Sequence, residues 1–180
     1  MWHDDDQELM LVASTHVDDL KLTGDQVWNT WLVTAIEEKV GTLTLQYAKD
    51  GFDHCGIYHK QLPDGTVTMD QNNYVKTLKP IPLPKGVNLE AEASTHYQGA
   101  YLTLLGGLGW IILTRYDVSI FVCCLQRFGK SPKMKHLLNA NRLFAWLQKH
   151  EFTCHFKPLS GTLRVVCISD SASSGKTTRG

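Results

Sequence analysis

The sequence has no excess of either charge, since 18 Lys and Arg residues balance 18 Asp and Glu residues over 180 positions. This balance removes the whole-molecule argument for a strongly basic nucleic-acid binder, although single segments can still be basic. Hydrophobic residues make up 43% and charged residues 20%, a composition that excludes disorder throughout. The length suits one domain or parts of two.

Long hydrophobic runs are also lacking. The longest, 102–113, is interrupted by Thr103 and is far shorter than the about 18 apolar residues that cross a bilayer. We therefore expect no transmembrane helix and no membrane partner. The start of the chain, with its acidic run 4–6, has neither the basic residues nor the apolar stretch of a signal peptide. An intracellular, cytoplasmic location is the expectation.

Cysteines that could pair or bind a metal in a recognisable pattern are lacking. Five cysteines, an odd number, fit a reducing compartment. The neighbouring His and Cys at 54–55 and at 154–155 lack the usual spacing of zinc ligands, so buried structural roles are the favoured interpretation. Cys123 and Cys124 lie in an apolar stretch and are interpreted as core residues, because a free thiol packs as a small hydrophobe.

The segment 9–24 predicts a β-hairpin. Its apolar residues alternate in two short runs on either side of 16–19, which is the expected turn. Asp18 and Asp19 are thereby placed next to each other near the tip.

A helix and a second hairpin are predicted next. Asp25 is a suitable cap for a helix over 27–40, where apolar residues recur at helical spacing. Alternation returns in 42–69, and Pro63-Asp64-Gly65 is a turn signal inside it. A short helix over 70–78 is the expected end of this part.

The second half predicts three successive helices. Three prolines make 80–94 an extended connector. Helices are expected over 97–113, 117–128 and 132–150, the last with Ser131 as its N-cap. Further on, a strand over 163–169 leads to Asp170 and a Ser-, Gly- and Thr-rich tail. The predicted fold class is α+β.

The adjacent carboxylates at the hairpin tip are the first candidate for chemistry. Magnesium prefers carboxylate and phosphate oxygens, and in nucleotidyl transfer such carboxylates support two ions that stabilise the attacking and leaving oxygens. Aspartate pairs are also common in solvated turns, and this alternative is favoured when the pair is considered alone.

The surrounding order of motifs changes that balance. The hairpin reads Thr15-His16-Val17-Asp18-Asp19-Leu20-Lys21-Leu22-Thr23-Gly24. It resembles the Y-V-D-D hairpin of reverse transcriptases, specifically the copia-type retrotransposon form Y-V-D-D-hydrophobic-x-hydrophobic-T-G.

Further blocks follow in the family's order. The stretch L-G-I/E…G-x-I-x-L-x-Q-x-x-Y, which includes the region that grips the primer end, is matched by Cys55-Gly56-Ile57, Asp64-Gly65-Thr66-Val67, Gln71 and Tyr74. The pattern Y-R-S-x-x-G-x-L-x-Y-x-x-x-T-R-P-D-I…F is matched by Tyr97-Gln98, Leu104-Leu105-Gly106-Gly107-Leu108, Thr114-Arg115-Tyr116-Asp117-Val118 and Phe128. The blocks R-I-L-R-Y-L and Y-S-D-A-D are matched by Arg142-Leu143-Phe144-Ala145-Trp146-Leu147 and Ile168-Ser169-Asp170-Ser171-Ala172.

The resemblance implies a fragment of an RNA-directed DNA polymerase within a retrotransposon polyprotein. It implies that Asp18 and Asp19 are catalytic and bind Mg²⁺, and that Asp170 is a catalytic residue of ribonuclease H. The implied partners are an RNA/DNA template-primer duplex, deoxynucleotides and the remainder of the polyprotein. The implied segments are a partial palm with the second hairpin (1–79), a connector (80–96), thumb and connection helices (97–158) and the truncated start of ribonuclease H (159–180).

The chain departs from the family pattern in three respects. His16 stands in place of Tyr and Tyr116 in place of Pro. In the family a third polymerase carboxylate comes from a strand upstream of the hairpin, and the acidic run 4–6 is a poor substitute. Ribonuclease H likewise needs several carboxylates. We therefore expect the isolated chain to be inactive, with exposed apolar surface on the hairpin that the fingers and palm would cover.

A basic surface is the second candidate. The segment 118–150 has no Asp or Glu, and its cations are Arg127, Lys130, Lys133, Lys135, Arg142 and Lys149. Such a surface attracts phosphates through counterion release, unless it is an ordinary solvated helix face.

Gly106 and Trp110 share one helix face, and the resemblance places them in a thumb pattern, L-x-G-x-L-x-W, that tracks the minor groove. A Trp buried against a small residue is the competing interpretation. For the whole chain the alternative is a non-catalytic nucleic-acid-binding or structural remnant of a degenerate element. An upstream reading frame with the missing Asp would favour the enzyme.

Overall fold

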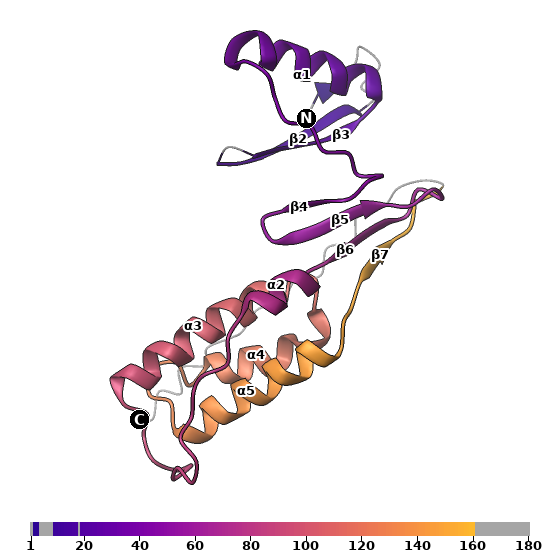
Figure 1. Ribbon diagram of the computed structural model, residues 1–180. Helices are drawn as coiled ribbons and strands as arrows, with labels where there is room; N and C mark the ends of the chain where they lie inside the picture. Colours follow the sequence, from indigo (N-terminus) through magenta and orange to yellow (C-terminus); the bar gives the residue numbers. More distant parts are fainter. Residues whose placement is uncertain (1, 4–8, 18, 161–180) are drawn as a thin grey trace, which may run out of the picture.

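The computed structural model describes residues 2, 3, 9–17 and 19–160 (Figure 1). The acidic run 4–6, Asp18, the predicted strand over 163–169 and Asp170 lie outside the described residues. Two small antiparallel sheets and a group of helices make up the described part, so the predicted α+β class is confirmed. No helix within that part is long and apolar enough to cross a membrane.

The first sheet contains the predicted aspartate hairpin. Strands β1 (Trp2–His3), β2 (Leu9–His16) and β3 (Asp19–Gly24) lie in the order β1-β2-β3, all antiparallel. His16 pairs with Asp19 across the turn, and Val17 at the tip has a φ of 54°. The tight turn therefore holds Asp19 at the end of a two-stranded ribbon, as the alternation predicts.

Helix α1 (Gln26–Val40) follows directly and contacts β2 and β3 (Figure 1). The Asp25 carboxylate accepts a hydrogen bond from the Val27 N–H at 2.8 Å, which confirms the predicted cap. Gly41 ends the helix with a φ of 93°, a backbone conformation that favours glycine. None of the residues of α1 is buried.

The second sheet contains the other predicted hairpin and a strand that the sequence did not predict. Strands β4 (Phe52–His54), β5 (Ile57–Gln61), β6 (Val67–Asp70) and β7 (Cys154–Phe156) lie in that order and are antiparallel. The pair β5–β6 is the predicted hairpin. Strand β7 returns after the last helix and pairs with β6, so this sheet joins residues that precede the helical half with residues that follow it.

The helical half carries the hydrophobic core. Its elements are α2 (Asn72–Thr77), α3 (Thr95–Ile111), the short 3₁₀ helix η1 (Tyr116–Val118), α4 (Ser119–Gln126) and α5 (Met134–Lys149). The three predicted helices are therefore present. Buried side chains from all these elements and from the connector pack together, among them Val75, Ile81, Tyr101, Leu108, Ile111, Val122, Leu137, Phe144 and Leu147.

The start of α5 differs from the prediction. The N-cap residue of α5 is Lys133, whereas the sequence predicted Ser131. The backbone N–H groups of Met134 and Lys135 donate to the carbonyls of Ala91 and Leu89, at 3.0 Å each. Because the connector supplies these acceptors, the chain just before Met134 pairs with the connector. The helix therefore begins at Met134 and not at the predicted Pro132.

The core assignment of the paired cysteines was wrong. Cys123 and Cys124 are both exposed. On α4 the residues at core-facing positions are Val122 and Leu125, which are three apart and buried, and the cysteines between them point outward.

Buried apolar side chains are unevenly distributed between the two halves. Before Val75, the only buried hydrophobic residue of the described part is Leu11. Large apolar side chains of this half are exposed, including Leu9, Val17, Leu20, Val27, Trp28, Trp31 and Val40. Exposed apolar surface on the aspartate hairpin is thus present, as expected, and α1 adds exposed apolar surface that was not predicted.

Candidate functional site

The aspartate hairpin meets the second sheet at its tip. Asp19 projects into solvent, with 63% of its side chain exposed, and its Oδ2 lies 3.9 Å from Nδ1 of His54 on β4. The ring of His16, on the other strand of the hairpin, meets His54 edge to face with centroids 6.3 Å apart. The second aspartate of the pair, Asp18, lies outside the described residues.

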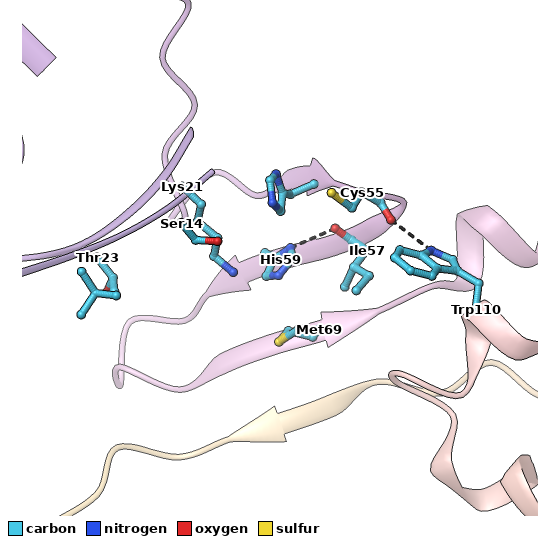
Figure 2. Close-up of a pocket in the computed structure, with 10 residues that line it drawn as sticks. Ser14, Lys21, Thr23, Cys55, Ile57, His59, Met69 and Trp110 are labelled. Atoms are coloured by element: carbon cyan, nitrogen blue, oxygen red, sulfur yellow. Dashed lines mark hydrogen bonds between the residues drawn. The ribbon is translucent and has the colours of Figure 1, made fainter. Parts of the chain in front are cut away.

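A cleft of about 400 Å³ lies between the two hairpins, with residues of β2 and β3 on one side and residues of the second sheet and Trp110 on the other (Figure 2). The first hairpin provides one wall, the second sheet the opposite wall, and α3 one residue. The lining residues are Val12, Ser14, Lys21 and Thr23 from β2 and β3, then His54, Cys55, Ile57, His59 and Met69, and finally Trp110. His54 both lines the cleft and approaches Asp19, so the aspartate lies beside one residue of the cleft wall.

One positive charge faces a neutral imidazole across the cleft. His59 is 4% exposed, its Nδ1–H donates to the Ile57 carbonyl at 2.9 Å, and its ring stacks on Phe52. Burial lowers the pKa of His59, and the nearby ammonium of Lys21 lowers this pKa further. The pKa of Lys21 is lowered by burial as well. At neutral pH His59 is therefore uncharged, and Lys21 is the cation that lines the cleft.

Trp110 connects the helical half to this cleft. Its indole Nε1–H donates to the Cys55 carbonyl at 3.1 Å, in the turn between β4 and β5. The Gly56 backbone in this turn has a φ of 73°, which favours glycine. The Trp110 side chain is 40% exposed, so it is not the fully buried Trp of the competing interpretation. Gly106, one turn earlier, is exposed, and no heavy atom lies within 4 Å of where a Cβ would be.

The predicted basic residues do not form one continuous surface. Arg127 and Lys130 are exposed at the end of α4, where the Gln98 amide of α3 donates to the carbonyls of Gly129 and Lys130 at 3.1 and 2.8 Å. The Gly109 backbone of α3 also lies against Gln126. The end of α4 and its two cations are thus held beside the α3 face that carries Gly106.

Lys133 and Lys135 are turned toward the connector. Their ammonium groups lie 3.1 and 2.9 Å from the carboxylate of Glu90. These hydrogen bonds lower the pKa of Glu90, which therefore stays ionised and offsets one of the two positive charges. Arg142 is exposed on α5, and its guanidinium lies 3.4 Å from Oδ1 of Asn139.

A buried polar group beside α3 was not identified as a site from the sequence. Arg115 is 2% exposed and binds the Asp117 carboxylate with Nε and Nη2, both at 2.9 Å. Its Nη1 donates to the His150 carbonyl at 2.7 Å, and hydrogen bonds from Arg115 lower the pKa of Asp117. The sequence contains a local signal for this pair, an Arg and an Asp two residues apart in the Thr114–Val118 block. The resemblance used this block only as a marker of the family.

The chemistry of the tip suits magnesium in part. Asp19 offers an exposed carboxylate, the type of ligand that Mg²⁺ prefers. Within residues 2, 3, 9–17 and 19–160 no group of three His, Cys, Asp or Glu side chains is placed to hold a metal ion. Asp19 therefore fits as one ligand of a site that needs further oxygens.

No protein-family model, curated protein or solved structure matches the chain. Function is therefore inferred from the residues and their geometry.

Proposed function

We propose that this chain is part of an RNA-directed DNA polymerase of the copia retrotransposon type, in which it holds the end of a template-primer duplex. The observation that carries the proposal is the meeting of the aspartate hairpin and the second hairpin across one cleft. In the resembled family these two hairpins bear the metal-binding aspartates and the grip on the primer end. In this chain the two hairpins are far apart in sequence, since His16 of the first and His54 of the second sheet are separated by more than 30 positions.

The residues of the cleft have distinct roles in this proposal. Lys21 places a positive charge in the cleft, where a backbone phosphate of the primer would lie. Neutral His59 and the apolar residues around it provide a surface for the sugar and base. Asp19 lies beside His54 of the cleft wall, and the reacting primer hydroxyl would lie near this carboxylate.

The exposed face of α3 supports contact with the duplex further from the tip. Gly106 leaves space for close approach of a nucleic-acid backbone, and Trp110 presents a partly exposed indole at the mouth of the cleft. Arg127 and Lys130, held beside this face, supply charges for phosphates. Lys133 and Lys135 contribute less, because Glu90 accompanies them.

Asp18 and Asp19 would hold Mg²⁺ in this proposal. When bound, the ion stabilises the charge that develops on the reacting oxygens during phosphoryl transfer. Asp19 would supply one carboxylate ligand, and the resemblance places a third carboxylate in the remainder of the polyprotein.

The test joins the 180-residue chain to the fingers and upstream palm of a copia-type reverse transcriptase and measures primer extension with Mg²⁺. We expect extension by the fusion, and a loss of at least about 100-fold in Asp19→Asn, because a metal-binding carboxylate becomes neutral. Asp53→Asn, an exposed aspartate on β4, is the matched control and keeps its activity. An active fusion that is indifferent to Asp19→Asn would contradict the role of the hairpin.

A further inference from the structure

The C-terminal end of α5 carries an ordered stack of side chains outside the cleft. The imidazole of His150 lies on the indole of Trp146 with ring centroids 4.3 Å apart and planes inclined by 16°. The Arg115 guanidinium lies 5.3 Å from the centroid of the same indole. Trp146 is 42% exposed and His150 is exposed, so this stack is part of the molecular surface.

His150 is held in place by two contacts of its imidazole and one of its backbone carbonyl. Its Nδ1–H donates to the Trp146 carbonyl at 2.8 Å, and its ring rests on the Trp146 side chain. The backbone carbonyl of His150 accepts a hydrogen bond from buried Arg115 at 2.7 Å. Because one face of the ring is covered and the residue is exposed, the uncovered ring face is a fixed flat surface toward solvent. A fixed ring loses little conformational entropy when a ligand stacks on it.

Cations accompany this surface on the same side of the helix. Arg142, Trp146, Lys149 and His150 recur at intervals of three and four residues, which places them along one helix face. Within the described part of the chain neither Arg142 nor Lys149 has a carboxylate within ion-pair distance.

The nearest acidic groups do not cancel this charge. Asp117 is bound to Arg115, and Glu151 is 3.0 Å from the ammonium of Lys76. Both carboxylates are thus already paired, and the net charge of the surface is positive. A ligand that combines flat rings with negative charge is the complement of such a surface.

We propose that Trp146 and His150 form a stacking platform for a base of single-stranded nucleic acid, with Arg142 and Lys149 binding its adjacent phosphates. Successive bases and phosphates of a single strand match a ring flanked by two cations that have no carboxylate partner within the described residues. Stacking needs no particular base sequence, because every base has a flat face. This surface shares with the proposed function the premise that the chain binds nucleic acid. It does not depend on the metal chemistry of the hairpin.

The test compares two single strands of equal length and charge on the full chain. One probe is a fluorescein-labelled 12-nucleotide oligothymidylate, and the other is the same strand with abasic sites in place of the bases. Fluorescence anisotropy at low salt measures both dissociation constants. We expect the normal strand to bind at least about five-fold more tightly, since one stacked base is worth that much or more.

Variants separate stacking from charge. The double variant Trp146→Ala with His150→Ala removes the preference for bases, and His150→Phe alone, which retains a flat ring, keeps it. His155→Ala, an exposed histidine on β7, is the matched control and changes nothing. Arg142→Gln with Lys149→Gln weakens both strands alike, whereas the same charge change at Lys39 and Lys85 does not. Circular dichroism and the unfolding midpoint of each variant check that its fold is retained.

Three results would overturn the proposal. These are the absence of single-strand binding at low salt, equal affinity of the unaltered chain for the two strands, and an unchanged preference in a folded variant with Trp146→Ala and His150→Ala. Binding of a template-primer duplex is measured in parallel. If the duplex fails to bind while the base-dependent single-strand affinity remains, the proposed polymerase function fails and the stacking platform stands.

Discussion

Asn141 on α5 fixes the proline-containing connector with both ends of its amide. Its Oδ1 accepts a hydrogen bond from the Ile81 N–H and its Nδ2 donates to the Ile81 carbonyl, both at 2.8 Å. Ile81 is 4% exposed, so water does not readily replace these bonds. We expect Asn141→Leu to lower the free energy of unfolding by about 2 kcal/mol, the cost of leaving buried backbone groups unpaired.

Urea unfolding followed by circular dichroism measures this change. Asn139→Leu, an exposed asparagine on the same helix, is the control and shifts the unfolding free energy by less than about 0.5 kcal/mol. Equal effects of the two substitutions would show that the Ile81 contacts contribute nothing.

Two histidines make the stability depend on pH near neutrality. Burial lowers the pKa of His59 and of His136 below the ordinary value of 6.5, and Nδ1 of His136 accepts a hydrogen bond from the Lys133 N–H that protonation would break. Below pH 6.5 the unfolded chain binds these protons before the folded chain does. Stability is therefore full above pH 6.5 and falls as the pH drops toward the lowered folded-state values.

Unfolding midpoints in urea between pH 7.5 and 5.5 check this sign. The variant with His59→Gln and His136→Gln should lose less stability over this interval than the unaltered chain. The carboxylates with lowered pKa, such as Asp117, have an ordinary value of 3.8 and contribute to acid sensitivity only below this window. Stability of the unaltered chain that stays constant or rises toward pH 5.5 would contradict the account.

At the scale of elements, local signals predicted most of the secondary structure, and contacts distant in sequence determined the exceptions. Asp25 caps α1 because its carboxylate reaches an N–H two residues away. Strand β7 has three residues, too few for an alternating pattern, and its partner β6 lies 85 or more positions earlier. The start of α5 depends on carbonyls at Leu89 and Ala91, which no propensity at Ser131 could reveal.

For the candidate site, too, local sequence signals predicted some features and contacts distant in sequence determined the others. The sequence placed Asp19 at a hairpin tip through the turn alone, and the structure agrees. It did not predict the cleft, since His54, His59 and Lys21 meet only when two hairpins approach each other. It also could not reveal that Glu90 accompanies Lys133, because 43 positions separate the two residues.

The elements should differ in local stability because the buried side chains are concentrated in one half. Helices α3 and α5 surround the core, whereas α1 has no buried residue. Amide hydrogen exchange should therefore be slower in α3 and α5 than in α1, β2 and β3. Mass spectrometry after timed exchange and pepsin digestion measures this difference. Equal protection of α1 and α3 would show that the first half is more firmly packed than its exposure indicates.

On the scale of the whole molecule, three parts follow one another along its length: the aspartate hairpin with α1, the four-stranded sheet, and the helices (Figure 1). The chain passes between the sheet and the helices twice, from β6 to α2 and from α5 to β7, and the Trp110 hydrogen bond is a third link between the two parts. The aspartate hairpin with α1 has fewer links to the other two parts. Its exposed Trp28 and Trp31 offer apolar surface to a neighbour. In the proposed function this neighbour is the remainder of the polymerase.

The central claim, that this chain holds a template-primer duplex, is tested most directly by the salt dependence of duplex affinity. We expect the logarithm of the association constant to fall linearly with the logarithm of salt concentration. Arg127→Gln with Lys130→Gln should reduce the magnitude of this slope by about two, because each phosphate contact contributes about 0.9. The same charge change at exposed Lys39 and Lys85 should leave the slope as it is. No duplex binding at low salt, or a slope unchanged by loss of Arg127 and Lys130, would contradict the claim.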